Sequence, residues 1–417
     1  MRTILHCDIN NCFASIEMLR EPGLRVRPLA VCGDPGLRRG IVLAKSESAK
    51  VCGVKTGDTL WQAREKCPNI QFVKASFGLY GQYARRFRQI LLSLTPRVEP
   101  CGLDECWLDM TGDMARFGVD EGVLGDWLRV HIKRHLGLTV SVGVSFNKVF
   151  AKLASDLKKP DAVTVIGFED FSVRVSGVGV SQLLGVGRQT AMKLRRCGIQ
   201  TIGQLARSDV CFLRGMFGKC GEDLWRHANG LDASPVRTPQ ESSGRQTLGH
   251  GTTLPFDYAD AASLWPVVLQ LSERVWHGLV AEGLRTRGLA LTVRDASLRF
   301  HLYQCRFRHC LVSSANMAGL VLMMLRQQYD WLLPVRAIQV RALYLESVSA
   351  PRQGELFAQA GVGQWLESGG QAIDAVMGTI NGRLGSHTLR RASLLKGIST
   401  QPCLMPGVSV PGGDSLD

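Results

Sequence analysis

The sequence predicts an α+β protein built from several domains, and three observations lead to this fold class. The chain has 417 residues, whereas a single hydrophobic core stops growing at roughly 250–300 residues. Hydrophobic residues make up 45% and charged residues 21%, which is typical of globular proteins and not of disordered or fibrous ones. Strand-like and helix-like segments also follow one another in the order β-α-β-β-α-β, first near the N-terminus and again after residue 244.

The first of these layouts begins with a mostly apolar segment at residues 2–9, which predicts a buried strand, followed by a helix from residue 12. A region rich in glycine and charge comes next, with turns at residues 33–36 and at Gly53. The remaining predicted elements are a basic amphipathic helix at 80–94, strands at 97–100 and 105–110, a helix at 122–136 and a strand at 138–145.

Short helix-like segments separated by glycines fill residues 171–237, which predicts a small helical domain, and the polar stretch at 230–244 indicates a linker. In the second layout, two neighbouring strands have apolar residues at every second position, as in a half-buried sheet. These positions are Leu289, Leu291, Val293, Leu298, Phe300 and Leu302. The other predicted elements are strands at 246–254 and 335–343 and helices at 259–282 and 315–330.

The charge balance favours a polyanionic partner. Lysine and arginine number 50 against 36 acidic residues, a net charge of +14, and such an excess is typical of proteins that bind nucleic acid. Residues 242–345 hold 11 arginines, no lysine and 6 acids. An open sheet with arginine on its outer face suits phosphate contacts, and ordinary solvation explains the same pattern equally well.

The cysteines and the N-terminal residues indicate the cellular compartment in which the protein is expected. The 13 cysteines contain no CxxC pair, which argues against a disulfide framework and against a zinc ribbon and fits reduced thiols in the cytosol. Asp8 stands where a signal peptide needs apolar residues, and no apolar run reaches the roughly 20 residues of a membrane span. We therefore expect a soluble cytoplasmic protein with no membrane partner.

Three acids are the strongest candidates for chemistry. Asp8 closes a buried strand, and Asp104 and Glu105 lie in the turn between two strands. Carboxylates at adjacent strand ends can converge, and their repulsion is relieved by hard cations such as Mg²⁺. Two such ions about 4 Å apart would support phosphoryl transfer. A solvated hairpin end explains the Asp104–Glu105 pair as well, but an acid that ends an apolar strand needs a partner.

Five stretches resemble, in the same order, the motifs of the Y-family DNA polymerases, the class that copies past damaged bases. They are DINNCFASIE (residues 8–17), GVKTG (53–57), LDE with LD (103–105 and 108–109), SVGVSFNK (141–148), and AKLASD with KP (151–156 and 159–160). Residues 184–202 also resemble the thumb of that family. The resemblance is strong from residue 2 to about 236 and continues more weakly to about residue 391.

The resemblance implies the right-hand architecture of a polymerase, with a palm, small fingers, a helical thumb and a separate little finger. The implied ranges are 1–12 and 75–165 for the palm, 13–74 for the fingers, 166–236 for the thumb, 237–243 for a linker, 244–346 for the little finger and 347–400 for a C-terminal segment. Residues 401–417 are rich in Pro, Gly and Ser and are expected to be a disordered tail.

The resemblance also implies roles for single residues. The metal ligands would be Asp8, Asp104 and Glu105, with the backbone oxygen of Ile9. Phe13 would be the steric gate, whose ring takes the space of a ribose 2′-hydroxyl. Without the motif, it would be interpreted as an ordinary packed phenylalanine.

Lys159 and Lys50 would contact the incoming triphosphate, although the family usually has an arginine at the position of Lys50. Three departures surround this site: Asn10 replaces a more common aspartate, Ala44 a threonine, and Glu47 a tyrosine. An acid near the triphosphate should weaken nucleotide binding unless Lys45 or a metal offsets its charge.

Contacts to DNA are expected in two places. Gly185 and Gly187 fit a helix-hairpin-helix, in which backbone N–H groups at a helix start approach a phosphate, and Lys193 adds charge. An isolated pair of glycines is also explained as a plain helix cap. In the second layout, arginines on the strands, among them Arg294, would hold the template-primer by its backbone.

A short motif after the last strand resembles the peptides by which bacterial polymerases bind the sliding clamp. Leu356 and Phe357 would fill an apolar pocket, and Gln353 would bond at its rim. Motifs of five residues also occur by chance.

Together these features predict a monomeric, template-directed DNA polymerase of low fidelity that uses two Mg²⁺ ions, a dNTP and primer-template DNA and copies past lesions. The alternative is a catalytically weak or inactive DNA- and clamp-binding protein derived from such a polymerase. Glu47 and Ala44 motivate the alternative, and the intact Asp8, Asp104 and Glu105 argue against it.

Overall fold

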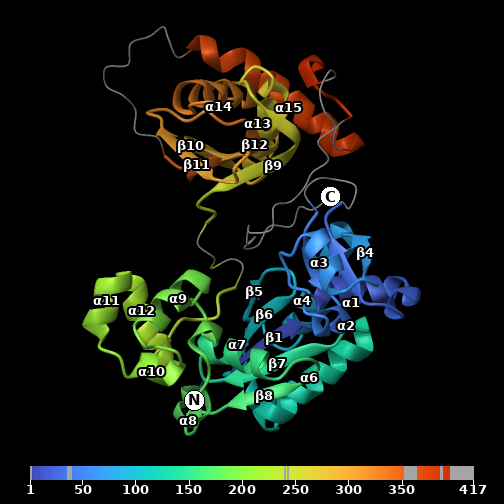
Figure 1. Ribbon diagram of the computed structural model, residues 1–417, viewed down its shortest axis with the longest axis vertical. Coiled ribbons are helices and arrows are strands. Elements are labelled where there is room, and N and C mark those ends of the chain that lie inside the picture. The colour runs from blue at the N-terminus through green and yellow to red at the C-terminus, as the bar shows by residue number, and fades with distance from the viewer. Residues whose placement is uncertain are drawn as a thin grey trace. The chain divides into compact units, whose positions relative to one another are not determined.

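The computed structural model describes residues 2–34, 40–238, 241, 244–351, 364–385 and 388–394. Two compact units make up the fold, one that ends before residue 243 and one that begins there. Both combine helices with β-sheet (Figure 1). No helix in the described ranges is both long enough and apolar enough to cross a membrane.

A five-stranded sheet forms the centre of the first unit, with its strands in the order β5-β6-β1-β7-β8. Neighbouring strands are antiparallel except β7 and β8, which are parallel and joined by helix α7. The bounds are β1 Ile4–Ile9, β5 Val98–Cys101, β6 Glu105–Asp109, β7 Val140–Ser145, β8 Val163–Ile166 and α7 Lys148–Leu157. Strand β1 lies in the middle and all six of its residues are buried, so both of its faces are covered.

Side chains that alternate along β1 enter two different cores. Leu5, Cys7 and Ile9 belong to the main core. Helices α1 (Cys12–Arg20), α4 (Phe77–Leu92) and α6 (Glu121–Leu136) contribute to the same core. Ile4 lies in a smaller cluster with Trp107 of β6 and Ala151 of α7. The other even-numbered residues of β1 share the face of Ile4 and therefore face α7.

The expected elements of this layout are confirmed, but three features were not predicted. Helix α7 follows β7, strand β8 adds a fifth strand to the sheet, and a second sheet in the order β3-β2-β4 lies within residues 13–74. Its strands are β2 Leu29–Cys32, β3 Val42–Lys45 and β4 Gln71–Lys74, and the nearby helices are η1 Pro22–Arg25, α2 Glu47–Val51 and α3 Leu60–Lys66. Strands of four residues are too short for an alternating pattern to stand out in the sequence.

Short helices follow β8, as expected from the glycine spacing, and pack into a core that they share with α7 and β8. They are α8 Phe171–Ser176, η2 Val180–Gln182, α9 Arg188–Arg196, α10 Ile202–Ala206, α11 Val210–Phe217 and α12 Lys219–Ala228. A further short helix, α5 (Met114–Phe117), follows β6.

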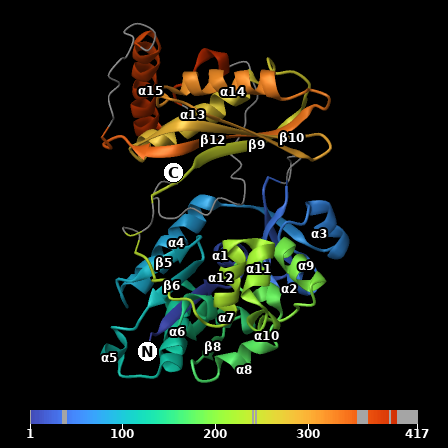
Figure 2. The ribbon, with the colours of Figure 1, turned by 90° about the vertical axis from the view of Figure 1, so that its left-hand side faces the viewer.

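The second unit is an antiparallel four-stranded sheet in the order β11-β10-β12-β9, covered on one face by α13 and α14 (Figure 2). The elements are β9 Leu248–Tyr258, α13 Trp265–Ala281, β10 Leu284–Asp295, β11 Phe300–Arg306, α14 Ser314–Gln328 and β12 Val335–Ser347. The predicted β-α-β-β-α-β order is thus confirmed. Helix α15 (Gln364–Leu384) and the turn η4 (Ala392–Leu394) were not predicted. Asp374 of α15 is buried and accepts a 2.7 Å hydrogen bond from the N–H of Ser314.

Gly143 of β7 allows helix α7 to lie directly on the central sheet. A Cβ atom here would come 1.9 Å from the carbonyl oxygen of Ala151 and 2.4 Å from the backbone nitrogen of Ser155. Gly143 is also the register partner of His6 on β1. The missing side chain therefore sets how closely α7 approaches the face that carries His6 and Asp8.

The substitution Gly143→Ala should destabilise the first unit by about 3 kcal/mol, because backbone atoms of α7 cannot rotate away from the new methyl group. Urea denaturation followed by circular dichroism measures the change. Gly112→Ala is the matched control: a Cβ there meets no atom within 4 Å, so we expect a change below about 0.5 kcal/mol. A loss at Gly143 as small as that of the control would contradict the described seating of α7.

Candidate active site

Two carboxylates face each other at one end of the central sheet. Asp8 of β1 is the register partner of Glu105 of β6, and partners in a ladder point to the same face. Asp104 directly precedes Glu105, and its carbonyl oxygen accepts a 3.0 Å hydrogen bond from the N–H of Ile9. The turn before these acids passes through Gly102, whose φ of 80° lies in the region that favours glycine. The turn and the register thus bring the three acids to one sheet end.

Two lysines on and just after α7 form ion pairs with these acids. Lys159 Nζ lies 2.5 Å from Asp8 Oδ2 and 2.8 Å from Asp156 Oδ1. Lys152 Nζ lies 2.6 Å from Glu105 Oε2. The partner of Lys152 could not be predicted from the sequence, although Lys152 lies within one of the quoted motifs, because the ion pair joins residues far apart in the chain.

The pKa values of the acids show that the negative charge is only partly balanced. Burial and the charges of Glu105 and Asp104 raise the pKa of Asp8 to about 7, although Lys159 acts against this. Burial and the charge of Glu105 raise the pKa of Asp104 to about 6. Burial alone would raise the pKa of Glu105 too, but His6 and Lys152 lower it to about 2. A further positive charge beside Asp8 and Asp104 would therefore be stabilising.

A cavity of about 200 Å³ opens beside Asp8 and Asp104. Its lining residues are Asp8, Ile9, Asn11, Cys12, Phe13, Leu43, Ala44, Lys45, Thr56 and Asp104. Glu105 does not line the cavity. Within the described ranges, no three His, Cys, Asp or Glu side chains are already arranged as a metal site. Glu105 is instead bound to Lys152 through Oε2.

Phe13 forms part of the cavity wall and is held by aromatic neighbours. Its ring stacks on Tyr80 with a centroid distance of 4.3 Å and an interplanar angle of 9°. Phe77 meets it edge-on at 6.0 Å. The hydroxyl of Tyr80 donates a 2.6 Å hydrogen bond to the buried carboxylate of Glu17. These contacts fix the ring of Phe13 at the edge of the cavity.

Lys45, and not Lys50, brings positive charge to the cavity wall. Lys45 lines the cavity and donates a 3.3 Å hydrogen bond to Thr56 Oγ1. Lys50 lies on α2 and pairs with Glu47 at 3.5 Å. Glu47 also accepts a 2.9 Å hydrogen bond from Asn11 Nδ2. The Glu47 carboxylate thus interacts with Lys50 and also with the amide of Asn11, which lines the cavity.

Asn10 has a structural use that an aspartate would not fully reproduce. It is 5% exposed, and its Nδ2 donates a 2.8 Å hydrogen bond to Ser141 Oγ of β7. Its Oδ1 accepts a 2.9 Å hydrogen bond from the N–H of Asp161, two residues after Lys159. The amide thus ties the loop that carries Lys159 to the sheet.

The glycines of the expected hairpin lie at the start of α9. Gly185 has a φ of 92° and packs against Leu224, and Gly187 is the N-cap residue of α9, without a side-chain capping bond. Lys193 is exposed in the last turn of the same helix, with its Nζ 6.0 Å from the ring centroid of Phe217.

Arg294 lies on β10 in the second unit, where it is half-buried. Its guanidinium stacks over the ring of Phe300 at 4.9 Å, and its Nε donates a 3.2 Å hydrogen bond to the carbonyl of Leu298. The expected clamp residues Gln353, Leu356 and Phe357 lie outside the described residues.

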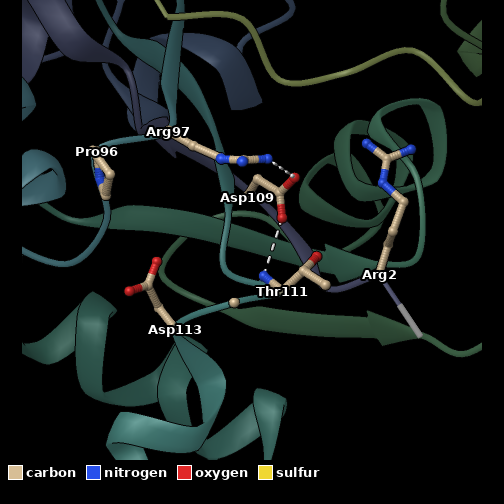
Figure 3. Close-up of a pocket in the computed structure, with 7 residues that line it drawn as sticks. Arg2, Pro96, Arg97, Asp109, Thr111 and Asp113 are labelled. Carbon is tan, nitrogen blue, oxygen red and sulfur yellow. Dashed lines mark hydrogen bonds and ion pairs between the residues drawn. The ribbon is translucent and has the colours of Figure 1, made fainter.

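A second cavity, of about 370 Å³, lies at the opposite end of β1 and β6 (Figure 3). Its charged residues interact with protein groups: Arg2 donates to the carbonyl of Ser234, and Arg97 lies 3.9 Å from Asp109. The Asp109 carboxylate also accepts a 3.0 Å hydrogen bond from the N–H of Thr111. This cavity lacks the excess of negative charge found beside Asp8 and Asp104.

Three family models match the chain. The impB/mucB/samB family covers residues 7–156, its C-terminal domain covers residues 245–356, and a thumb domain described from DNA polymerase-iota covers residues 181–232. Among solved structures, a Y-family DNA polymerase chimera of Dbh and Dpo4 is similar with a TM-score of 0.75 and 23% identity, over 83% of this chain and 99% of that one. An insertion ternary complex of Dbh DNA polymerase has a TM-score of 0.58 and 22% identity, over 82% and 98% of the two chains.

Among curated proteins, two relatives named DNA polymerase IV match nearly the whole chain. The protein of Acetivibrio thermocellus is 40% identical over 95% of this chain and 98% of its own length. That of Pelotomaculum thermopropionicum is 34% identical over 93% and 94%. Together with the fold and the acids at the end of its central sheet, these similarities show that the chain belongs to the Y family of translesion DNA polymerases.

Proposed function

We propose that the chain is a DNA-directed DNA polymerase that carries out translesion synthesis by nucleotidyl transfer from a dNTP to a primer 3′-hydroxyl. The observation that carries this function is the cavity that the buried Asp8, the half-buried Asp104 and the aromatic ring of Phe13 line together. Identity of 40% to a full-length DNA polymerase IV supports the reaction type.

Two Mg²⁺ ions would be held by Asp8, Asp104 and Glu105, together with the carbonyl of Ile9. The residues fit such ions because all the ligands are oxygens and because the raised pKa values of Asp8 and Asp104 reveal uncompensated negative charge. When bound, the ions would activate the 3′-hydroxyl and balance charge on the triphosphate.

The lysines around the acids would contact the nucleotide. Lys159 already bonds the carboxylates of Asp8 and Asp156, and we infer that it exchanges Asp8 for the triphosphate when that carboxylate gains another positive partner. Lys45 already lines the cavity and supplies a second positive charge. Lys50 lies on α2, the helix that directly follows the strand of Lys45. Phe13 would exclude a ribose 2′-hydroxyl.

The sheets and helices can be assigned to the hand of a polymerase. The palm would be residues 1–12 and 75–165, the fingers 13–74, the thumb 166–236 and the little finger 244–346. The uncapped N–H groups after Gly187, the charge of Lys193 and arginines such as Arg294 would hold the DNA backbone without reading its sequence. Small fingers would close little over the base pair, which implies low fidelity.

A sliding clamp would bind Gln353, Leu356 and Phe357, and the polymerase would act as a cytoplasmic monomer. Primer extension with Mg²⁺ and dNTPs on undamaged and damaged templates tests the proposed function. We expect activity on both templates and a loss of more than about 100-fold in Asp104→Ala. A wild type as inactive as Asp104→Ala would instead support the non-catalytic DNA-binding alternative.

Asp104→Asn should raise the midpoint of thermal unfolding by about 2–4 °C at pH 8 without divalent metal, because it removes one of several clustered negative charges. The folded-state pKa of Asp104 is raised to about 6. The destabilisation is therefore fully present above that pH and is lost as the pH falls toward about 4. The advantage of the variant should shrink at pH 5.

Mg²⁺ should stabilise the wild type and the control Asp113→Asn, whose acid lines the cavity at the other end of the sheet, but not Asp104→Asn. Equal stabilisation of all three proteins by Mg²⁺ would contradict a metal site at Asp104.

Phe13→Ala should admit ribonucleotides, because the ring that would exclude the 2′-hydroxyl is removed. We expect the ratio of kcat/KM for dNTP over rNTP to fall by about 10–100-fold. Phe77→Ala removes a neighbour of Phe13 that does not line the cavity, so its ratio should change much less. An unchanged ratio in Phe13→Ala would mean that the residue only packs.

A further inference from the structure

His6 is a buried polar residue next to the acids, and the proposed reaction gives it no role. It is 0% exposed and lies on β1, two residues before Asp8. Side chains two apart on a strand share a face, so His6 and Asp8 point to the same side of the sheet. The register places His6 between Trp107 of β6 and Gly143 of β7.

The Nδ1 side of the ring has a defined partner. Ser155 Oγ of α7 lies 2.8 Å from His6 Nδ1. The same hydroxyl lies 2.7 Å from the carbonyl oxygen of Lys152, and it can donate its one hydrogen to either acceptor. The close seating of α7 on Gly143 makes this contact possible.

The Nε2 side of the ring points at Glu105 without bonding to it. Nε2 lies 3.6 Å from Glu105 Oε2, which is too long for a hydrogen bond, and it has no hydrogen-bond partner in the described structure. Lys152 holds that same oxygen at 2.6 Å. A buried donor left without a partner is unfavourable, so a hydrogen bond from Nε2 to Glu105 would stabilise the site.

The tautomer follows from these neighbours. A bare nitrogen lone pair that faces a carboxylate would be repelled, so the hydrogen of a neutral ring belongs on Nε2. In this tautomer Nδ1 accepts, so Ser155 must turn its one hydrogen from the carbonyl of Lys152 to Nδ1.

We propose that His6 is a positioning residue for Glu105: when Lys152 releases the carboxylate, the Nε2–H of His6 donates a hydrogen bond to it and orients Glu105 toward the cation. The proposal rests on the proposed function. Its general basis is that carboxylates which bind metals are themselves held by hydrogen bonds, and that loss of such a partner typically weakens metal affinity 10–100-fold.

Mn²⁺ titration of the full chain, followed by electron paramagnetic resonance without DNA or nucleotide, tests the proposal. His6→Phe keeps a ring of similar size beside Trp107 but removes the donor, and we expect Mn²⁺ to bind about 10–100-fold more weakly. His6→Gln keeps an N–H donor near the position of Nε2 and should restore most of the affinity, whereas the shorter His6→Asn should not. His277→Phe, a histidine of α13 in the second unit, should bind Mn²⁺ like the wild type.

Long-range ¹H–¹⁵N spectra of the histidine-labelled protein give a second readout, and they should show His6 protonated at Nε2. Equal Mn²⁺ affinity in His6→Phe and wild type overturns the proposal. If His6→Phe does not fold, equal affinity in His6→Gln and His6→Asn overturns it. A hydrogen on Nδ1 also overturns it. A wild type whose Mn²⁺ binding is unaffected by Asp104→Asn refutes the proposed function as well, so the two failures can be told apart.

Discussion

The repulsion among Asp8, Asp104 and Glu105 is the constraint on which the rest of the site depends. The three acids are brought together by backbone features, namely the register of β1 with β6 and the turn at Gly102. Burial makes their repulsion stronger than it would be in water. Positive charge must therefore be brought to this end of the sheet by another part of the chain.

Helix α7 supplies that charge. Lys152 lies on this helix and Lys159 just after it, and both form ion pairs with the acids. The helix comes close enough because Gly143 has no side chain, and the same closeness brings Ser155 to His6. One small residue on β7 thus determines the partners of two carboxylates and of one histidine.

The sequence predicted the order of strands and helices in both units well, because each face of a long element repeats its apolar residues with a clear period. The four-residue strands β2, β3, β4 and β8 were missed because they are too short to show a period. Strand β5 is equally short but was recognised beside the turn at Gly102 and the longer β6. Helix α15 was missed although Asp374 and Met377 are buried in it. Several apolar residues of this helix are exposed, so its apolar positions do not form the single stripe by which an amphipathic helix is recognised.

The acids of the site could be named from the sequence because they end strands and lie in recognisable motifs. Their partners could not, since Lys152 and Glu105 are distant in the chain and meet only through the packing of α7 on the sheet. The triphosphate contact was assigned to Lys50 because the resemblance places it where the family usually has an arginine. The structure places Lys45 in the cavity wall instead, because the direction of a side chain depends on the short strand β3 that carries it.

Anomalous diffraction at the manganese edge is the sharpest test of the proposed metal site, on crystals of the full chain with primer-template DNA, a nucleotide and Mn²⁺. We predict strong peaks among the carboxylates of Asp8, Asp104 and Glu105, with Lys152 no longer bonded to Glu105. Intact pairs of Lys159 with Asp8 and of Lys152 with Glu105, with no peak beside the three acids, would refute the site.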